Sequence, residues 1–530
     1  MKRVMGTSKV MLGEIVADRL ACITSRIISI EQRGFVRDRN ISDCVILASE
    51  AINSIDKRQY GGNIALKVDI SKAFDTLDWN FLIMVLNNFG FSTTFINWIL
   101  AILQSARLSI LVNGKAIGFF SCSRGVRQGD PLSPLLFCLA EEILNRAISA
   151  SSARGRLIPI SYCRGTYLPT HVLYADDIMI FCTGLKSNIR ELISRFYTGS
   201  MSVSRAHMIA NMLGFNVGAV PFLYLGCPIF QGKAKVIHFR TITGKIKNKL
   251  STWKGTVLSI MGRVQLVKSI IHGMLVYYFH IYLWPKRLLC LLDSWIKNFI
   301  WSGDVLARKV CTVSWSIMSR SWAEGGLDIK PTRLINEALI LKLAWDFRAK
   351  DTQWTSIFKR RYFTHGQPIM RYCKTSVWSR IKSHIGTVMA NSVWVVGTGE
   401  SINFWIDNWL GEPLVDLIHL ETDFHAHLKG TVSEVIVNGA LRLPTVLTAV
   451  GDIQTRVNEI ILPTGKLPDA LVWNHTSDGN LTSKQAFDFL RPRSLSLPWA
   501  ESIWSSAIPP SHSCIYWRLH HDKMPIDENL

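Results

Sequence analysis

Two apolar runs that flank a pair of aspartates constrain the fold of this chain more than any other feature. The segment HVLYADDIMIFC places Asp176 and Asp177 between the candidate strands His171–Ala175 and Ile178–Cys182. This spacing predicts an antiparallel hairpin with the acidic pair at its tip. Carboxylates beside buried strands are costly unless a cation neutralises them. The segment therefore predicts a cation site or, more simply, a polar turn.

A third aspartate ends another apolar strand. The run GNIALKVDISKAFDTLDW predicts a strand over Asn63–Asp69, although an aspartate often ends a strand for no catalytic reason. If this strand lies beside the hairpin, three carboxylates converge, and their hard oxygen atoms suit Mg²⁺. Two such ions can activate a 3′-hydroxyl and stabilise a leaving pyrophosphate. The three aspartates are therefore candidate ligands for a phosphoryl-transfer site.

A basic loop with two glycines precedes a predicted helix. In SRGVRQGDPLSPLLFCLAEEIL, Gln128 and Gly129 come shortly before Ser133–Pro134, which predict an N-cap followed by proline at the first helical position. Glycine in such a loop lets the backbone approach a substrate closely. The alternative is an ordinary capped surface helix.

The chain is strongly basic, and its charge is uneven. Its 530 residues contain 60 Lys and Arg against 39 Asp and Glu, a net charge of +21. Thirteen basic residues and no acidic residue occur between Glu191 and Asp293. A segment of this length with only positive charges favours a surface that binds phosphate groups. Nucleic acid is therefore the expected partner, and no apolar run reaches the ~20 residues of a membrane span.

Periodicity predicts a mixed helix and strand architecture for the first 230 residues and a mainly helical, tryptophan-rich region from 236 to 390. The other expected strands are Leu108–Val112 and Phe222–Leu225. The expected helices are Gly13–Ile28, Ser42–Ile55, Trp79–Asn88, Thr93–Gln104, Pro134–Ser149 and Asn188–Tyr197. The eleven cysteines are scattered, which predicts reduced thiols. With no signal peptide, we expect a nuclear or cytoplasmic protein that is not secreted.

Five ordered segments resemble motifs of the reverse transcriptases of non-LTR (LINE-type) retrotransposons of plant type. They are QRGFVRDRNISD, LKVDISKAFDTLDW, RGVRQGDPLSPLLF, YADD and FLYLGCPIF. Later segments such as LSTWKGTVLSIMGRVQLVKSII and EGGLDIKPTRLINEALILKLAWDF resemble regions that follow in plant LINE proteins. The last segment, IPPSHSCIYWRLHHDKMPIDENL, resembles the start of their zinc-binding region. The resemblance covers nearly the whole chain.

This resemblance implies an α+β fold with the fingers and palm of a right-hand polymerase. The fingers and palm would occupy residues 1–235, followed by a basic, helical, thumb-like region at 236–320. A tryptophan-rich connector would follow at 321–470, and a smaller, irregular and truncated zinc-binding region at 471–530.

The resemblance also implies residue roles. Asp69, Asp176 and Asp177 would be catalytic and would hold two Mg²⁺ or Mn²⁺ ions. Phe74 would exclude a ribose 2′-hydroxyl, and Leu225–Gly226 would lie in the hairpin that grips the primer. The implied nucleotide-binding residues are Phe74, Gln128, Gly129, Arg37 and Arg39. The implied nucleic-acid-binding residues are Lys245, Lys247, Lys249, Lys254 and Arg263. The partners would be an RNA template, a DNA primer and deoxynucleoside triphosphates.

The sequence departs from the family pattern in four places. It starts inside the fingers, it has an internal deletion near 196–200 that removes a lysine, and no ribonuclease H acidic set follows. It also ends before the expected zinc ligands, and Cys514, His520 and His521 do not form a zinc site by themselves. We therefore expect an RNA-directed DNA polymerase of weak or no activity, from a truncated copy.

Three alternatives to this polymerase remain. One is a non-catalytic remnant that binds RNA or DNA, which salt-dependent binding without extension would reveal. A group II intron maturase shares the palm motifs, but the LINE-like C-terminal region argues against it. The bulky Phe74 argues against an RNA-directed RNA polymerase.

Overall fold

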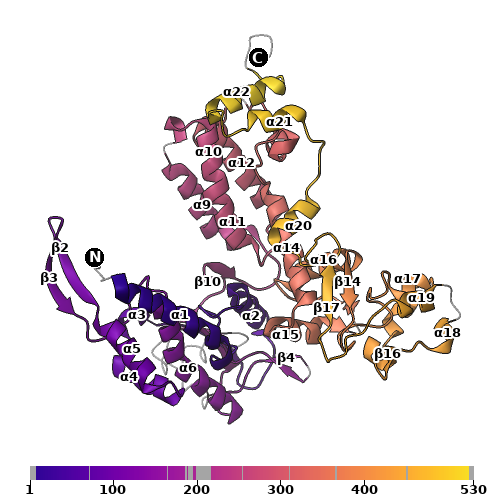
Figure 1. Ribbon diagram of the computed structural model, residues 1–530, viewed down its shortest axis with the longest axis horizontal. Helices are drawn as coiled ribbons and strands as arrows, with labels where there is room; N and C mark the ends of the chain where they lie inside the picture. The colour runs from indigo at the N-terminus through magenta and orange to yellow at the C-terminus, as the bar shows by residue number, and fades with distance from the viewer. Residues whose placement is uncertain are drawn as a thin grey trace. The chain divides into compact units, whose positions relative to one another are not determined.

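The computed structural model describes residues 7–524 apart from 71, 164, 186–187, 189–194, 199–216, 254, 310, 365–366, 370 and 449–451 (Figure 1). The chain divides into two compact units, Met1–Gln231 and Gly232–Leu530. This division lies close to the boundary expected after residue 235. The boundaries expected at residues 320 and 470, both within the second unit, stay predictions.

A five-stranded sheet forms the centre of the first unit, with strand order β6-β7-β1-β8-β9. Ile64 and Leu66 of β1 pack with Ile178 and Ile180 of β7 on one face, where Ile148 of a covering helix joins the same cluster. The strands are β1 (Asn63–Asp69), β6 (His171–Tyr174), β7 (Asp177–Thr183), β8 (Arg195–Thr198) and β9 (Val217–Gly218). Because side chains alternate along a strand, Lys67 and Asp69 lie on the opposite face.

A second core cluster includes Leu20, Leu86, Ile99 and Leu136. The described part of this unit has several helices, four of which contribute to that cluster. The helices are α1 (Thr7–Ile27), α2 (Ile41–Ser54), α3 (Ala73–Thr76), α4 (Trp79–Asn88), α5 (Thr93–Gln104) and α6 (Leu132–Ala153). The described part of the unit also contains three hairpins: β2 (Arg107–Val112) with β3 (Lys115–Ser121), β4 (Ser161–Cys163) with β5 (Thr166–Tyr167), and β10 (Phe222–Tyr224) with β11 (Cys227–Ile229). Figure 1 shows the β2–β3 hairpin projecting away from the unit's helices.

Two sequence expectations for the first unit need correction. Helix α6 begins at Leu132 and not at Pro134, because Oδ1 of Asp130 accepts a hydrogen bond from the Leu132 N–H at 3.0 Å and so supports an earlier start. The helix expected over Asn188–Tyr197 lies largely outside the described residues. Its described end belongs to strand β8, because this segment pairs with the edge of β1 and the sequence RFYT favours a strand.

The first part of the second unit is helical, as expected. Ile242, Ile246 and Leu250 are buried on one face of α9, at the helical spacing seen in the sequence. The elements are η1 (Val236–Phe239), α9 (Arg240–Thr252), η2 (Gly255–Val257), α10 (Ile260–Leu266), the π-helical η3 (Val267–Ile271), α11 (His272–Phe279), α12 (Lys286–Ser302), α13 (Trp315–Met318), η4 (Trp322–Glu324), α14 (Thr332–Ala349), α15 (Gln353–Tyr362) and α16 (Trp378–Ala390). Helix α14 packs against α11, α12, α16 and α20 and is therefore central to this unit.

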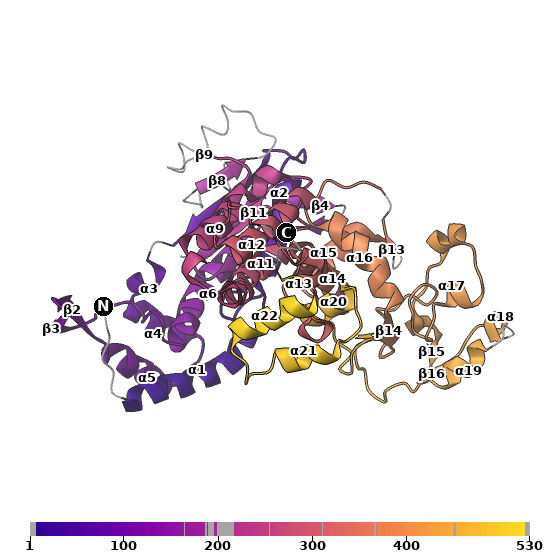
Figure 2. The same cartoon turned by 90° about the horizontal axis from the view of Figure 1, so that it is seen from above.

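The remainder of the second unit has short elements. They are β12 (Phe363–Thr364), β13 (Gln367–Pro368), β14 (Ser392–Val395), α17 (Leu414–Leu417), η5 (Thr422–His427), η6 (Val432–Val435), β15 (Ile436–Val437), β16 (Ala440–Leu441), α18 (Thr445–Thr448), α19 (Ile453–Asn458), β17 (Ala470–Trp473), α20 (Ser483–Leu490), α21 (Pro498–Ile503) and α22 (Pro510–His520). Strand β14 pairs with β17, and Figure 2 shows α21 beside α22.

The eleven cysteines are all free thiols. Among the helices that the structure describes, none combines the length and apolar character needed to cross a membrane.

Candidate active site

Three aspartates lie at one end of the sheet in the first unit. Antiparallel pairing of β1 with β7 places Asp69 opposite Asp177, and Asp176 immediately precedes Asp177. The N–H of Ile70 donates to the carbonyl of Asp176 at 3.3 Å, the pattern that flanks a non-hydrogen-bonded pair. In such pairs the Cα atoms lie about 4.5 Å apart and the side chains are close. The pairing therefore brings Asp69 of β1 beside Asp176 and Asp177 at the start of β7.

The electrostatics of this end of the sheet reflect accumulated negative charge. Burial raises the pKa of Asp177; Lys67 opposes this shift, while Asp176 and Asp69 add to it. Neighbouring carboxylates repel one another when they are ionised, and a divalent cation would relieve this repulsion. Carboxylate oxygens are also the hard ligands that such a cation prefers. As placed, however, no group of three His, Cys, Asp or Glu side chains in the described part of the chain is close enough to hold a metal ion. Asp69 is exposed, and its charge nevertheless adds to the raised pKa of Asp177.

The turn that carries Asp176 is strained and tightly packed. Tyr174 pairs with Asp177, so Ala175 and Asp176 form a two-residue turn. Ala175 has φ +52°, in the left-handed region that costs a non-glycine residue about 1–2 kcal/mol. Its side chain is buried against Ala73 and Phe137. The surrounding packing therefore enforces the turn conformation that presents the acidic pair.

The segment before the second helix supports this turn from the edge of the sheet. Oε1 of Gln32 accepts hydrogen bonds from the N–H groups of Ala175 at 3.1 Å and Gly34 at 2.7 Å. A Cβ atom on Gly34 would lie 2.5 Å from the nitrogen of Ala175. The Leu173 N–H also donates to the Glu31 carbonyl at 2.9 Å. Sequence reasoning missed this supporting role of Gln32, because nothing local distinguishes a buried glutamine.

A buried carboxyl group lies beside the acidic turn. Nε2 of Gln32 donates to Oε2 of Glu141 on α6, while Oε1 of Glu141 has no hydrogen-bond partner in the described structure. Burial, followed by the charge of Asp176, raises the pKa of Glu141 to about 9. Glu141 is therefore protonated at neutral pH and adds no charge to the site. Nothing in its local sequence distinguishes Glu141 from an ordinary helix carboxylate.

Among the residues implied to contact nucleotide, Phe74 lies on α3, shortly after Asp69, and Gln128 and Gly129 lie in the loop before α6. Phe74 is half-buried, and its ring stacks on Phe137 with centroids 5.3 Å apart. The carbonyl of Phe74 accepts a hydrogen bond from the Val126 N–H at 2.7 Å, which ties α3 to the basic loop. In that loop Gln128 and Gly129 are exposed, and Gly129 has φ +85°. The loop is thus anchored at one end and open at the other.

Two family models match the chain at separate places. The model described as reverse transcriptase (RNA-dependent DNA polymerase) matches residues 8–209, and that described as zinc-binding in reverse transcriptase matches residues 481–530. The chain carries a reverse transcriptase domain. All three aspartates fall within it.

Several relatives agree with this family. A protein from Arabidopsis thaliana that is named as a ribonuclease H protein is 25% identical over 323 residues, which are 57% of this chain and 51% of that protein. An uncharacterized protein of transposon TX1 from Xenopus laevis is 24% identical over 351 residues, 62% of this chain and 25% of that protein. A Pol polyprotein of the retrotransposable element R2DM from Drosophila melanogaster is 28% identical over 150 residues, 28% of this chain and 13% of that protein. The chain therefore spans about half or less of these relatives, and the resemblance to non-LTR retrotransposon proteins is confirmed.

The reverse transcriptase domain holds its two arginine candidates differently. Arg37 is exposed. The guanidinium of Arg39 donates to the backbone carbonyls of Ser29 at 2.5 Å, Gln32 at 2.6 Å and Ile28 at 2.8 Å, just beyond the end of α1. Burial and the charge of Arg33 lower the pKa of Arg39. Arg39 thus has a structural role, which leaves Arg37 as the arginine available to a ligand.

The hairpin that follows the reverse transcriptase domain match lies next to the acidic turn. Tyr224 pairs with Cys227, so Leu225 and Gly226 form its tip, with φ of +48° and +72°. Both values suit a type I′ turn. The hydroxyl of Tyr224 donates to the Asp177 carbonyl at 3.5 Å, and Nζ of Lys67 donates to the Leu223 carbonyl at 3.1 Å. The implied primer-grip hairpin is therefore tied to both strands that carry the aspartates.

The basic residues of the second unit differ in exposure. Lys245 and Lys249 are exposed on α9, and Lys247 is half-buried with Nζ 5.9 Å from the Trp295 ring centroid. Lys254 lies outside the described residues. The expectation that Arg263 binds nucleic acid needs correction. Its side chain is buried, and its guanidinium donates to the Phe299 carbonyl at 3.3 Å near the end of α12. Arg263 therefore does not lie on a surface that nucleic acid can reach.

In the segment that matches the zinc-binding model, Cys514, His520 and His521 are in structural contacts, whereas His512 is exposed. Cys514 is buried in α22. Nε2 of His521 donates to the Gly325 carbonyl at 2.8 Å, and the His520 ring stacks on Trp499 with centroids 4.7 Å apart. Over the described ranges these residues belong to no group of three or more potential metal ligands.

Proposed function

We propose that this chain is an RNA-directed DNA polymerase that adds deoxynucleotides to a 3′-hydroxyl by nucleotidyl transfer. The first unit would supply fingers and palm, and the helices after residue 236 a thumb-like region. The observation that carries the proposal is the register that sets Asp69 opposite Asp177 beside Asp176. Its partners would be an RNA template, a DNA primer and deoxynucleoside triphosphates.

The three aspartates would hold two divalent metal ions. When bound, such ions would supply the positive charge that activates a 3′-hydroxyl and stabilises a leaving pyrophosphate. The protein's part is to fix the acidic turn, through the packing of Ala175 and its hydrogen bond to Gln32. Lys67 adds a positive charge that favours the ionised form of Asp177.

The remaining candidates would position the nucleotide. Phe74, held against Phe137, would exclude a ribose 2′-hydroxyl. The exposed loop at Gln128 and Gly129 would approach the incoming nucleotide and template, and Arg37 would contact phosphate. The half-buried position of Phe74 and the anchoring of the loop at Val126 support this arrangement.

A primer-extension assay with an RNA template, a DNA primer and Mg²⁺ tests the proposal. We expect deoxynucleotide incorporation that is lost in Asp176→Asn and retained in Asp18→Asn, which removes an exposed carboxylate of α1. The rate should be low, because the segment between β7 and β10 lacks the lysine that the family resemblance implies. Extension that survives Asp176→Asn would refute the proposed site.

Non-catalytic binding of RNA or DNA is the second candidate. It is favoured by the spacing of the carboxylates, which form no metal-binding group of three in the part of the chain that is described. Salt-dependent binding of a primer–template without any extension, in Mg²⁺ or Mn²⁺, would establish this function instead.

A further inference from the structure

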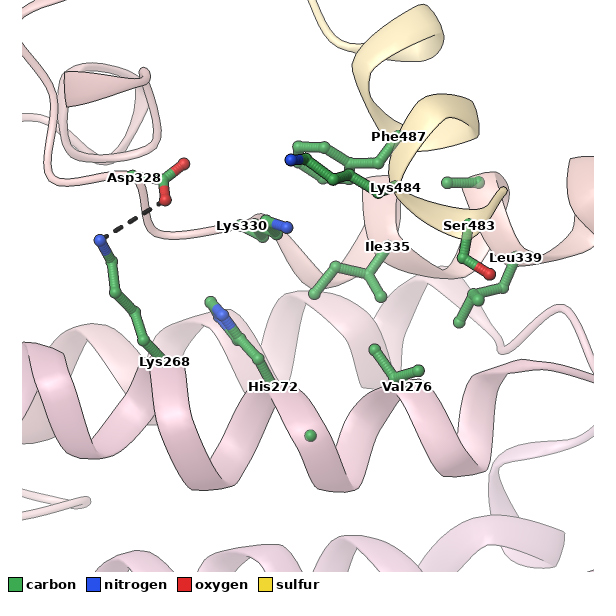
Figure 3. Close-up of a pocket in the computed structure, with 12 residues that line it drawn as sticks. Lys268, His272, Val276, Asp328, Lys330, Ile335, Leu339, Ser483, Lys484 and Phe487 are labelled. Atoms are coloured by element: carbon green, nitrogen blue, oxygen red, sulfur yellow. Dashed lines mark ion pairs between the residues drawn. The ribbon is translucent and has the colours of Figure 1, made fainter. Parts of the chain in front are cut away.

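A cavity of about 340 Å³ lies within the second unit, between α11, α14, α20 and the loop that precedes α14 (Figure 3). Its apolar wall comes from Val276 on α11, Ile335 and Leu339 on α14, and Phe487 on α20. A volume of this order is at the lower end of the range for small-molecule sites. The segment that matches the zinc-binding model therefore closes one side of a ligand-sized hollow.

The other wall of the cavity is positively charged. Nζ of Lys268 lies 3.6 Å from Oδ2 of Asp328, and Nζ of Lys330 lies 4.9 Å from the ring centroid of Phe487. Figure 3 shows Lys330 and Lys484 reaching into the same space above His272. Three ammonium groups and one carboxylate line the cavity, so the site has an excess of two positive charges. Like charges that converge on a hollow are stabilised by an anion.

A buried histidine supplies a second and independent sign of a ligand. The side chain of His272 lines the cavity, the residue is only 7% exposed, and its Nε2 has no hydrogen-bond partner among the described residues. Burial, reinforced by the charges of Lys330 and Lys268, lowers the pKa of His272 to about 4. The ring is therefore neutral at pH 7. A buried polar atom left without a partner is unfavourable, so a ligand that bonds to Nε2 would be stabilised.

We propose that this cavity binds an organic phosphomonoester, with its phosphate between Lys330, Lys484 and His272. A phosphomonoester has a charge of about −1.5 to −2 at pH 7, which matches the excess positive charge. Lysine binds phosphate as a point charge, and neutral His272 donates one hydrogen bond through Nε2. The apolar wall at Val276, Ile335 and Phe487 accepts a flat ring beside the phosphate. A nucleotide 5′-phosphate, free or at the end of a strand, has this chemistry.

Binding of 5′-AMP to the full chain in EDTA tests the proposal, because EDTA removes metal-dependent binding at the carboxylates. We expect saturable binding of AMP, no binding of adenosine, and affinities about tenfold or more weaker in Lys330→Met and Lys484→Met. The matched control is Lys466→Met, which removes an exposed lysine of the same unit and should leave the affinity within about twofold.

A second arm distinguishes the source of the phosphate. An oligonucleotide with a 5′-phosphate should compete with AMP better than the same oligonucleotide with a 5′-hydroxyl if strand ends are the natural ligand. Competition by neither oligonucleotide would assign the cavity to free nucleotides. Both results support a phosphate site, and neither depends on primer extension.

A readout on the unmutated protein guards against misfolded variants. AMP should protect Lys330 and Lys484 from acetylation, measured by mass spectrometry of peptides, and should not protect Lys466. Absence of AMP binding together with equal acetylation of all three lysines with and without AMP would overturn the proposal.

Discussion

Oε1 of Gln32 accepts a hydrogen bond from the backbone N–H of Ala175 at 3.1 Å, which fixes the turn that precedes Asp177. Ala175 adopts φ +52°, so this turn needs support from outside the hairpin. The support comes from a segment more than a hundred residues earlier in the chain. The same oxygen also accepts a hydrogen bond from the Gly34 N–H. Gln32 therefore joins Gly34 directly to the acidic turn.

Replacement of Gly34 by alanine should displace the acidic turn. The new Cβ would lie 2.5 Å from the nitrogen of Ala175, and neither backbone can move without breaking the Gln32 hydrogen bonds. We expect a loss of about 1–3 kcal/mol in the free energy of unfolding and a fall of about 10²-fold in primer extension. Thermal unfolding and the extension assay measure these effects.

The control for this substitution is Gly13→Ala in α1. A Cβ atom there meets nothing within 4 Å, so alanine should be neutral or should stabilise the helix by about 1 kcal/mol. If Gly34→Ala behaves like Gly13→Ala in both assays, the close approach to the turn has no functional consequence.

Glu141 should make stability depend on pH. Its folded-state pKa is raised from 4.5 to about 9, so its contribution is fully present below about pH 4.5 and is lost as the pH rises toward 9. Glu141→Gln should therefore be more stable than the parent protein at pH 8, on the order of 1–3 kcal/mol, and the difference should shrink toward pH 5. Thermal unfolding across this pH range measures the effect, with the exposed Glu14→Gln as control. A constant difference at all pH values would contradict it.

The bounds of several helices and strands could be predicted to the residue from short stretches of sequence. Strand β1 and helices α4 and α5 have the expected bounds. Each helix begins after a residue whose side chain accepts a hydrogen bond from the first turn, Asp78 from Phe81 and Ser92 from Phe95. Caps and apolar periodicity are encoded within a few residues, so they can be recognised without tertiary information.

Long-range contacts could not be predicted in this way. Arg39 and Arg263 carry the charge expected of phosphate-binding residues, yet their guanidinium groups bond to backbone carbonyls. Glu141 becomes part of the site only because α6 passes beside the acidic turn. The convergence of Asp69 with Asp177 was expected from the motif resemblance, whereas the register that pairs them depends on the whole sheet.

Substitutions of the exposed lysines of α9 should change the salt dependence of nucleic-acid binding, whereas substitution of the buried Arg263 should change stability. Lys245→Ala and Lys249→Ala remove exposed charges, so each should lower the slope of log K against log[salt] for nucleic-acid binding by up to about 0.9 and change stability by less than about 0.5 kcal/mol. Arg263→Met should leave the slope unchanged and should destabilise the protein by about 1–3 kcal/mol, because it removes the buried donor to Phe299. A lower salt slope in Arg263→Met would restore Arg263 as a phosphate contact.

The ion pair between Arg491 and Glu324 should stabilise the second unit. Nη1 of Arg491, at the end of α20, donates to both carboxylate oxygens of Glu324 at 2.7 Å. Burial alone would raise the pKa of Glu324, but the hydrogen bonds and charge of Arg491 outweigh it and hold that pKa below its ordinary value. Arg491→Met should destabilise the unit by about 1–3 kcal/mol at pH 7, because a largely buried carboxylate loses its partner.

The pH dependence and an exposed pair provide the controls for Arg491→Met. A lowered folded-state pKa gives stability that is present above about pH 4.5 and is lost as the pH falls through the folded value, so the difference between parent and variant should shrink in acid. The exposed pair of Arg333 with Glu337 also has a 2.9 Å contact, yet Arg333→Met should cost less than about 0.5 kcal/mol. Equal losses of thermal stability in the two variants would show that burial does not strengthen the Arg491 pair.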